Sequence, residues 1–175
     1  MRDKQRICFV CLGNIVRSPL AQHLFMHLAS KAGAAERYEA DSAAVGDWHV
    51  GEPPDIRIRR VAAGHGLHND GRARQFRRSD FERFDWVIAM DGDNASYLRR
   101  LAATPAQRAR IRLLREFDPE AGPGAEVPDP YYAGMEGFEN VYQIVERAAH
   151  GLLRALERGE LVNRGEDGEH ASGSG

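Results

Sequence analysis

Residues 6–19 read RICFVCLGNIVRSP, and this stretch decides the interpretation of the fold. Its first six residues are mostly apolar and include β-branched side chains, which is typical of a buried strand. A Gly-Asn pair then leads to Ser18, a residue type preferred at helix N-caps, and to Pro19, which suits the first helical position. Apolar residues recur at helical spacing from there to Gly33. The opening segment therefore predicts a strand, a loop and a helix.

The same alternation continues along the chain. The expected strands are 38–44, 85–90 and 111–114, and the expected helices are 55–63, 92–103 and 136–158, with a short helical turn that begins at Ser79. Strands that alternate with helices favour an α/β fold with a parallel, doubly wound sheet. We expect one domain over residues 1–158, followed by a flexible tail over 159–175 that is rich in Gly, Ser and acidic residues.

Composition excludes several classes of protein. The 175 residues include only two cysteines, Cys8 and Cys11, too few for a disulfide scaffold or for a zinc site built from Cys alone. The formal net charge of −2 gives no bulk attraction to nucleic acid. No targeting segment or apolar run of ~18 residues is visible, so we expect a soluble cytoplasmic protein with no membrane partner. His49, His65 and His68 show no metal-ligand spacing and are expected at the surface.

The loop over residues 11–18 has the composition of an anion site. It follows the carboxyl end of a strand, where open parallel sheets bind ligands, and it leads into a helix N-terminus that favours negative charge. Gly and Asn tolerate the left-handed backbone that a concavity lined by N–H groups requires. Arg17 adds a planar fork of donors, and Cys11 enters the same positive field, which favours its thiolate. We therefore predict a thiolate that attacks phosphorus, with Ser18 donating a hydrogen bond to the sulfur.

Two other interpretations of Cys11 stay open at this point. Cys8 and Cys11 form a C-x-x-C pair, a spacing also used by thioredoxin-like redox couples. Here the pair lies in a strand, where three residues span ~10 Å and point the side chains to opposite faces, beyond the reach of a disulfide. Alternatively, Cys11 is simply a buried apolar residue.

Asp129 is the best candidate for an acid that protonates a leaving group. Pro128 and Pro130 stiffen the backbone around it, which suits a loop that holds a carboxylate over a site. The adjacent Tyr131 and Tyr132 offer aromatic walls for a flat substrate. The alternative is an ordinary Asp-Pro turn with exposed tyrosines.

Taken together, these motifs resemble the low-molecular-weight protein tyrosine phosphatase family. The similarity covers roughly residues 5–157 and rests on C-L-G-N-I-V-R-S-P at 11–19, followed far downstream by D-P-Y-Y at 129–132. It extends through the segments at 41–44, 48–51, 53–55, 73–75, 80–81 and 90–91. The joint occurrence of both motifs in this order is highly specific.

The resemblance implies a flavodoxin-like fold, with a four-stranded parallel sheet in the order 2-1-3-4 and helices on both faces. It implies a phosphoric monoester hydrolase with no metal or other cofactor, in which Cys11 is the nucleophile, Arg17 binds phosphate and Asp129 is the general acid and base. The phosphate-binding loop and its support would comprise Leu12, Gly13, Asn14, Ile15, Val16 and Ser18, and the substrate crevice would comprise Trp48, Tyr131 and Tyr132, with Ile15 contributing. The implied partners are a phosphotyrosine protein or peptide and a tyrosine kinase, and the implied assembly is a monomer or a weak dimer.

The chain departs from the family pattern at two positions. Many members have a second Cys directly before the Arg, where this chain has Val16, so we expect Cys11 to lack that disulfide partner after oxidation. Some relatives place a His near position 71 to support the Asn-Ser network, and here Gly71 occupies that position.

Three other functions compete with tyrosine phosphatase activity. Arsenate reductases share the loop, but their thioredoxin-coupled branch needs further cysteines, and this chain has none after Cys11. Protein-arginine phosphatases of the same superfamily tend to carry Thr where Ile15 stands. A phosphopeptide-binding module would need neither a nucleophile at Cys11 nor an acid at Asp129.

Overall fold

Four parallel strands form the sheet in the computed structural model, which describes residues 4–161. They are β1 (Gln5–Cys11), β2 (Tyr38–Ala44), β3 (Trp86–Ala89) and β4 (Ile111–Leu113), in the order β2-β1-β3-β4. The register pairs Cys11 at the end of β1 with Ala44 at the end of β2, so the loops that follow these strands leave the same edge of the sheet. The predicted flavodoxin-like fold and its strand order are confirmed.

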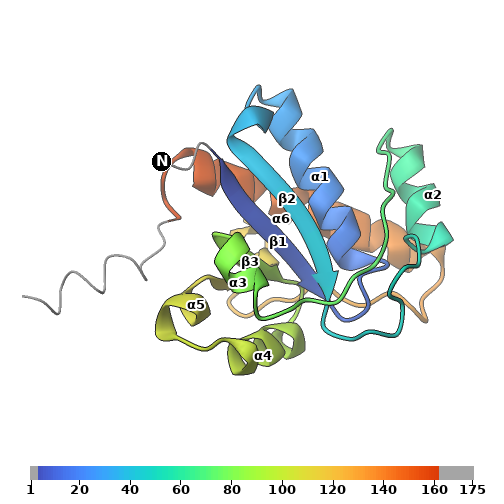
Figure 1. The fold of residues 1–175 in the computed structure, drawn as a ribbon. Coiled ribbons are helices and arrows are strands. Elements are labelled where there is room, and N and C mark those ends of the chain that lie inside the picture. The colour runs from blue at the N-terminus through green and yellow to red at the C-terminus, as the bar shows by residue number, and fades with distance from the viewer. Residues whose placement is uncertain (1–3, 162–175) are drawn as a thin grey trace, which may run out of the picture.

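Helices cover both faces of the sheet (Figure 1). One face packs against α1 (Arg17–Lys31), α2 (Ile56–Gly64) and α6 (Met135–Glu157), and the other packs against α3 (Asp80–Arg83) and α4 (Gly92–Leu101). The alternation of β1 assigns its side chains to these layers: Cys11 belongs to the first cluster and Cys8 to the second. Within residues 4–161, no helix is long and apolar enough to cross a membrane.

The first helix begins earlier than the sequence predicts. Ser18 was expected at the N-cap, but α1 starts at Arg17 and its N-cap, Val16, makes no capping hydrogen bond from its side chain. The reason is that the Ser18 hydroxyl bonds to the loop instead, accepting from Asn14 Nδ2 at 2.8 Å. A serine near a helix start can bond either to the free amides of the helix or to the preceding loop, and here it bonds to the loop.

The remaining differences lie at element ends and in short elements. Asp55 caps α2 by accepting from Arg57 N, so that helix runs one residue later than expected at each end. The helix expected over 92–103 ends at Leu101, because Ala102 is already extended. Residues 162–175 of the expected tail lie outside the described residues. The sequence analysis missed three short elements, namely η1 (Ala35–Arg37), α5 (Pro105–Ala109) and η2 (Leu114–Phe117).

The long helix α6 approaches η2 through a glycine. A Cβ added at Gly151 would lie 1.8 Å from the carbonyl oxygen of Phe117, so only glycine allows this approach. Next to it, the buried Asp118 accepts from Arg147 of α6 at 2.8 and 3.1 Å and from Arg115 at 3.1 Å. These contacts fix α6 against η2, the turn that follows β4.

We expect Gly151→Ala to lower the free energy of unfolding by about 1–3 kcal/mol, because the overpacking against Phe117 outweighs the better helix propensity of Ala. Urea unfolding followed by circular dichroism measures the change. Gly64→Ala is the matched control, because a Cβ at this helical glycine would meet no atom within 4 Å. A Gly151→Ala protein as stable as the Gly64→Ala protein would contradict this expectation.

Candidate active site

The loop after β1 turns sharply at Asn14. This residue has φ of +58°, and among the described residues it is the one non-glycine with positive φ. Its amide donates a hydrogen bond of 3.2 Å to the Cys11 sulfur. The turn therefore folds the loop back over the thiol, as the Gly-Asn pair predicts.

The side chain of Asn14 joins three segments beneath the loop. Its Oδ1 accepts from the backbone amide of Arg74 at 3.1 Å, and its Nδ2 donates to Ser18 Oγ at 2.8 Å. Ser18 Oγ lies 3.0 Å from Cys11 Sγ and 3.4 Å from the carbonyl of Ala43. Ser18 Oγ can donate to the carbonyl of Ala43 or to the sulfur, and when Cys11 is a thiolate, which has no proton to give, the shorter contact is a hydrogen bond from Ser18 to the sulfur. Gly71 has no side chain to support this network, and the Asn14 side chain is held instead by the backbone amide of Arg74.

Arg17 is buried beside the thiol. Its Nη1 donates to Asp91 Oδ2 at 2.7 Å and to the carbonyl of Val127 at 3.0 Å, and its Nη2 lies 3.7 Å from Asp129 Oδ2. Burial works to lower the pKa of Arg17, but Cys11 and the two carboxylates outweigh it, so the pKa is raised and the guanidinium stays charged.

Asp91 is a functional candidate to which the sequence analysis assigned no role. It follows β3 and caps α4, accepting from the amide of Asn94 at 2.8 Å through Oδ1, while Oδ2 holds Arg17. The available signal was an Asp between a buried strand and a helix start, but that pattern does not reveal which arginine the second oxygen binds.

Asp129 comes from a different part of the chain and is half-exposed. Its Oδ1 accepts from the amide of Tyr131 at 3.1 Å, which orients the carboxylate. The loop that carries it is tied to the sheet where Val127 N donates to the carbonyl of Met90 at 2.9 Å. We refer to residues 127–133 as the acid loop.

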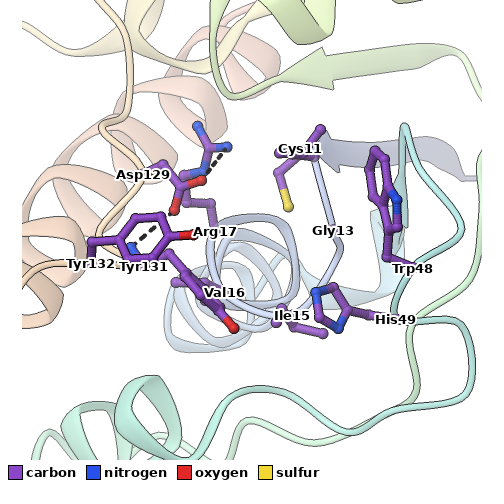
Figure 2. A pocket seen from close by; sticks show the side chains of 11 residues that line it. Cys11, Gly13, Ile15, Val16, Arg17, Trp48, His49, Asp129, Tyr131 and Tyr132 are labelled. Atoms are coloured by element: carbon purple, nitrogen blue, oxygen red, sulfur yellow. Dashed lines mark hydrogen bonds and ion pairs between the residues drawn. The ribbon is translucent and has the colours of Figure 1, made fainter.

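The predicted residues meet in one cavity of about 360 Å³. Its lining residues are Cys11, Leu12, Gly13, Ile15, Val16, Arg17, Trp48, His49, Asp129, Tyr131 and Tyr132. Arg17, Asp129 and the tyrosines lie on one side of the cavity, and Trp48 and His49 lie on the other (Figure 2). Asn14 and Ser18 do not line the cavity but support the loop from below.

His49 is the one cavity residue that the sequence analysis did not assign to the site. It was expected at the surface with His65 and His68, which are exposed and pair with Glu139 and Asp70. The His49 side chain is 31% exposed, close to the 34% of His65, but it lies at the cavity, and its ring packs close to Gly13, where an added Cβ would lie 3.0 Å from its Cδ2. Its Nδ1 contacts the carboxylate of Glu52.

Trp48 depends on a glycine two residues earlier. The indole is 68% exposed, and a Cβ at Gly46 would lie 1.8 Å from its ring. The ring therefore packs closely against Gly46, where it serves as a wall of the cavity rather than as part of the core.

The two cysteines are free and lie on opposite faces of the sheet. Burial raises the pKa of Cys8 well above its usual value, against a smaller opposing effect of Arg74, so Cys8 remains a neutral thiol. A Cys8–Cys11 redox couple does not fit this geometry. Among residues 4–161, no group of three or more His, Cys, Asp and Glu side chains is placed to hold a metal ion.

Comparisons with known proteins agree with this geometry. The family model for low molecular weight phosphotyrosine protein phosphatase matches residues 6–161. The chain belongs to this family. A low molecular weight protein-tyrosine-phosphatase of Streptomyces coelicolor is 49% identical over 152 residues, which cover 86% of this chain and 93% of the relative. The relative YfkJ of Bacillus subtilis is 39% identical over 153 residues, covering 87% and 96%.

Solved structures of the phosphatase family show the same fold. A protein tyrosine phosphatase from Entamoeba histolytica, with Hepes in its active site, has a TM-score of 0.86 at 36% identity, covering 90% of this chain and all of that one. The crystal structure of Bacillus subtilis YfkJ has a TM-score of 0.83 at 34% identity, covering 91% and 99%. The chain is therefore an enzyme of the phosphotyrosine protein phosphatase class, which acts on phosphoproteins.

We expect Ser18→Ala to slow alkylation of Cys11 by iodoacetamide, because the thiolate that reacts loses a hydrogen-bond donor. Mass spectrometry of the Cys11 peptide over time gives the rate. Ser42→Ala is the matched control, since Ser42 is a buried β2 serine whose hydroxyl donates to Gln22 instead. Equal alkylation rates in the two variants would refute the assigned direction of the Ser18 hydrogen bond.

Proposed function

We propose that this enzyme hydrolyses phosphotyrosine in proteins through a phosphocysteine formed on Cys11. The observation that carries the proposal is the convergence in one cavity of a thiol, a buried charged guanidinium and a half-exposed carboxylate from distant parts of the chain. Cys11 lies at the floor, Arg17 lies beside it, and the Asp129 carboxylate is 3.7 Å from Arg17.

In the first step the Cys11 thiolate attacks phosphorus, a new S–P bond forms and the P–O bond to the tyrosine ring breaks. Arg17 and the loop amides hold the non-bridging oxygens, whose charge they stabilise in the transition state. Asp129 gives its proton to the departing phenolate, so the leaving group is neutral tyrosine. Ser18 and the Asn14 amide stabilise the thiolate before attack.

In the second step water attacks the phosphocysteine. Asp129, now ionised, takes a proton from that water, the S–P bond breaks, and inorganic phosphate leaves. The hydrogen bonds that favoured the thiolate in the first step also favour its departure in the second. Each turnover restores the protonated acid and the free thiolate.

The shape of the cavity favours an aryl phosphate over an alkyl phosphate. Cys11 is 3% exposed at its floor, while Trp48 and Tyr131 stand at its mouth with 68% and 41% of their surface exposed. A phosphate that reaches the sulfur therefore needs a long, flat carrier that can lie between aromatic walls. Phosphotyrosine fits this requirement, whereas phosphoserine is too short to contact both walls. A tyrosine kinase is the class of enzyme that supplies such a substrate.

The residues of this site fit the three competing functions less well than they fit a tyrosine phosphatase. A thioredoxin-coupled arsenate reductase needs a relay of cysteines, but the chain has only two, and Cys8 lies on the other face of the sheet. Ile15 offers an apolar wall rather than the hydroxyl expected of an arginine phosphatase. A binding module gives no role to a carboxylate that shares the cavity with a thiol.

Cys11→Ser should abolish hydrolysis of 4-nitrophenyl phosphate, because a serine hydroxyl in this loop stays protonated and is a poor nucleophile. Release of nitrophenolate at saturating substrate measures the loss. Cys8→Ala is the matched control and should keep kcat, because Cys8 lies outside the cavity. Turnover by Cys11→Ser equal to that of the wild type would defeat the mechanism.

Asp129→Ala should lower kcat/KM for phenyl phosphate by about 10²–10⁴, because an unactivated phenolate needs a proton as it leaves. The loss should be much smaller for 4-nitrophenyl phosphate, whose leaving group is stable as an anion. Parallel kinetics with both substrates make the comparison, with Asp93→Ala, an exposed carboxylate on α4, as the control. An equal loss for both substrates would count against Asp129 as the acid.

A further inference from the structure

The acid loop is held in place by contacts at Tyr131 as well as by the contact of Asp129 with Arg17. The peptide units that flank Tyr131 are fixed at both ends, since its amide donates to Asp129 Oδ1 at 3.1 Å and its carbonyl accepts from Arg57 Nη1 at 3.0 Å. The orientation of the Asp129 carboxylate therefore depends on where Arg57 holds Tyr131. Arg57 does not line the cavity.

The guanidinium of Arg57 is itself oriented by Asp55. Its Nε donates to Asp55 Oδ1 at 3.0 Å and its Nη2 donates to Oδ2 at 2.8 Å, a paired contact that leaves Nη1 to reach Tyr131. The guanidinium carbon also lies 5.3 Å from the centre of the Tyr131 ring and 4.5 Å from that of Phe138. One side chain thus contacts the capping residue of α2, the acid loop and the start of α6.

Asp55 connects this arrangement to the phosphate-binding loop. Its amide donates to the carbonyl of Ile15 at 2.8 Å. A continuous path then runs from Ile15 through Asp55, Arg57 and Tyr131 to Asp129. Hydrogen bonding from Arg57 is the largest influence on the pKa of Asp55 and lowers it, so both members of the pair are charged at neutral pH.

We propose that Arg57 is a positioning residue that fixes where the general acid Asp129 lies relative to the phosphate-binding loop. This role rests on the proposed function, because it requires Asp129 to be the acid. Arg57 acts through the peptide units of Tyr131 and does not touch the reacting atoms. The pair is partly buried, with 33% of the Arg57 side chain and 13% of the Asp55 side chain exposed, so its role in positioning has to be measured apart from any effect on folding.

Arg57→Ala tests the role through the leaving-group dependence of kcat/KM. We expect a loss of about tenfold to hundredfold with phenyl phosphate, since small misplacements of a catalytic group have effects of this size, and a much smaller loss with 4-nitrophenyl phosphate. The ratio of the two kcat/KM values within one variant does not depend on how much of the sample is folded. Arg57→Lys should lie close to Arg57→Ala, because an ammonium cannot hold both Asp55 oxygens and the Tyr131 carbonyl.

A double variant separates positioning from a general structural effect. In an Asp129→Ala background, Arg57→Ala should cause little further loss with phenyl phosphate, because the acid on which it acts is gone. Arg60→Ala, an exposed arginine on the same helix, is the matched control and should behave as the wild type in both backgrounds. The melting temperature of each variant is measured alongside, because Arg57 also contacts the buried Phe138.

Two outcomes would overturn the role of Arg57. One is an equal loss with both substrates in Arg57→Ala, and the other is a full further loss in the Asp129→Ala background. Failure of the proposed function is distinguishable from either, because it would appear as wild-type protein that does not hydrolyse aryl phosphates, or as active Cys11→Ser.

Discussion

The left-handed turn at Asn14 is the constraint on which the site depends. A positive φ is unfavourable for a residue with a Cβ, and here the hydrogen bonds to Arg74, Ser18 and Cys11 stabilise it. Glycine would adopt the same backbone more easily, but it has no amide side chain to connect the three segments. The turn places the N-terminus of α1 beside the sulfur and directs the Ser18 proton toward it. Without the Asn14 bridge, neither the field of the helix nor the serine has a defined position relative to the thiol.

Local patterns in the sequence predicted the parts of the site that are contiguous in the chain. The strand, the turn at Asn14 and the residues from Cys11 to Ser18 follow from periodicity and residue type, and the sheet order follows from the family resemblance. The roles of Asp91, Arg74 and His49 depend on contacts between segments far apart in sequence. Ser18 shows most clearly what the sequence does not reveal. A serine before a proline is equally suited to cap the helix and to bond to the loop, and only the position of Asn14 decides between the two.

The two carboxylates near Arg17 differ in a way that suits separate roles. Asp91 is bound at 2.7 Å and also caps α4, so it is fixed by a helix and keeps Arg17 in place. Asp129 is 3.7 Å away and 45% exposed, on a loop, so it is free to exchange its contact with Arg17 for one with substrate. A bound phosphate would compete with Asp129 for the Nη2 donors while leaving the contact with Asp91 intact. The contact between Arg17 and Asp129 is therefore the one that we expect to break when substrate binds.

Arg17 and Arg57 are both oriented by an aspartate that caps the start of a helix. At α4, Asp91 uses one oxygen to cap the helix and the other to hold Arg17; at α2, Asp55 caps the helix and grips Arg57 with both oxygens. A carboxylate suits this position because it satisfies the free N–H groups, interacts favourably with the helix dipole and still has capacity for a guanidinium. A serine cap would satisfy the helix alone. Each arginine is thereby held by a carboxylate that is fixed at the start of a helix. Arg17 is held in this way beside the thiol, and Arg57 is held next to the acid loop.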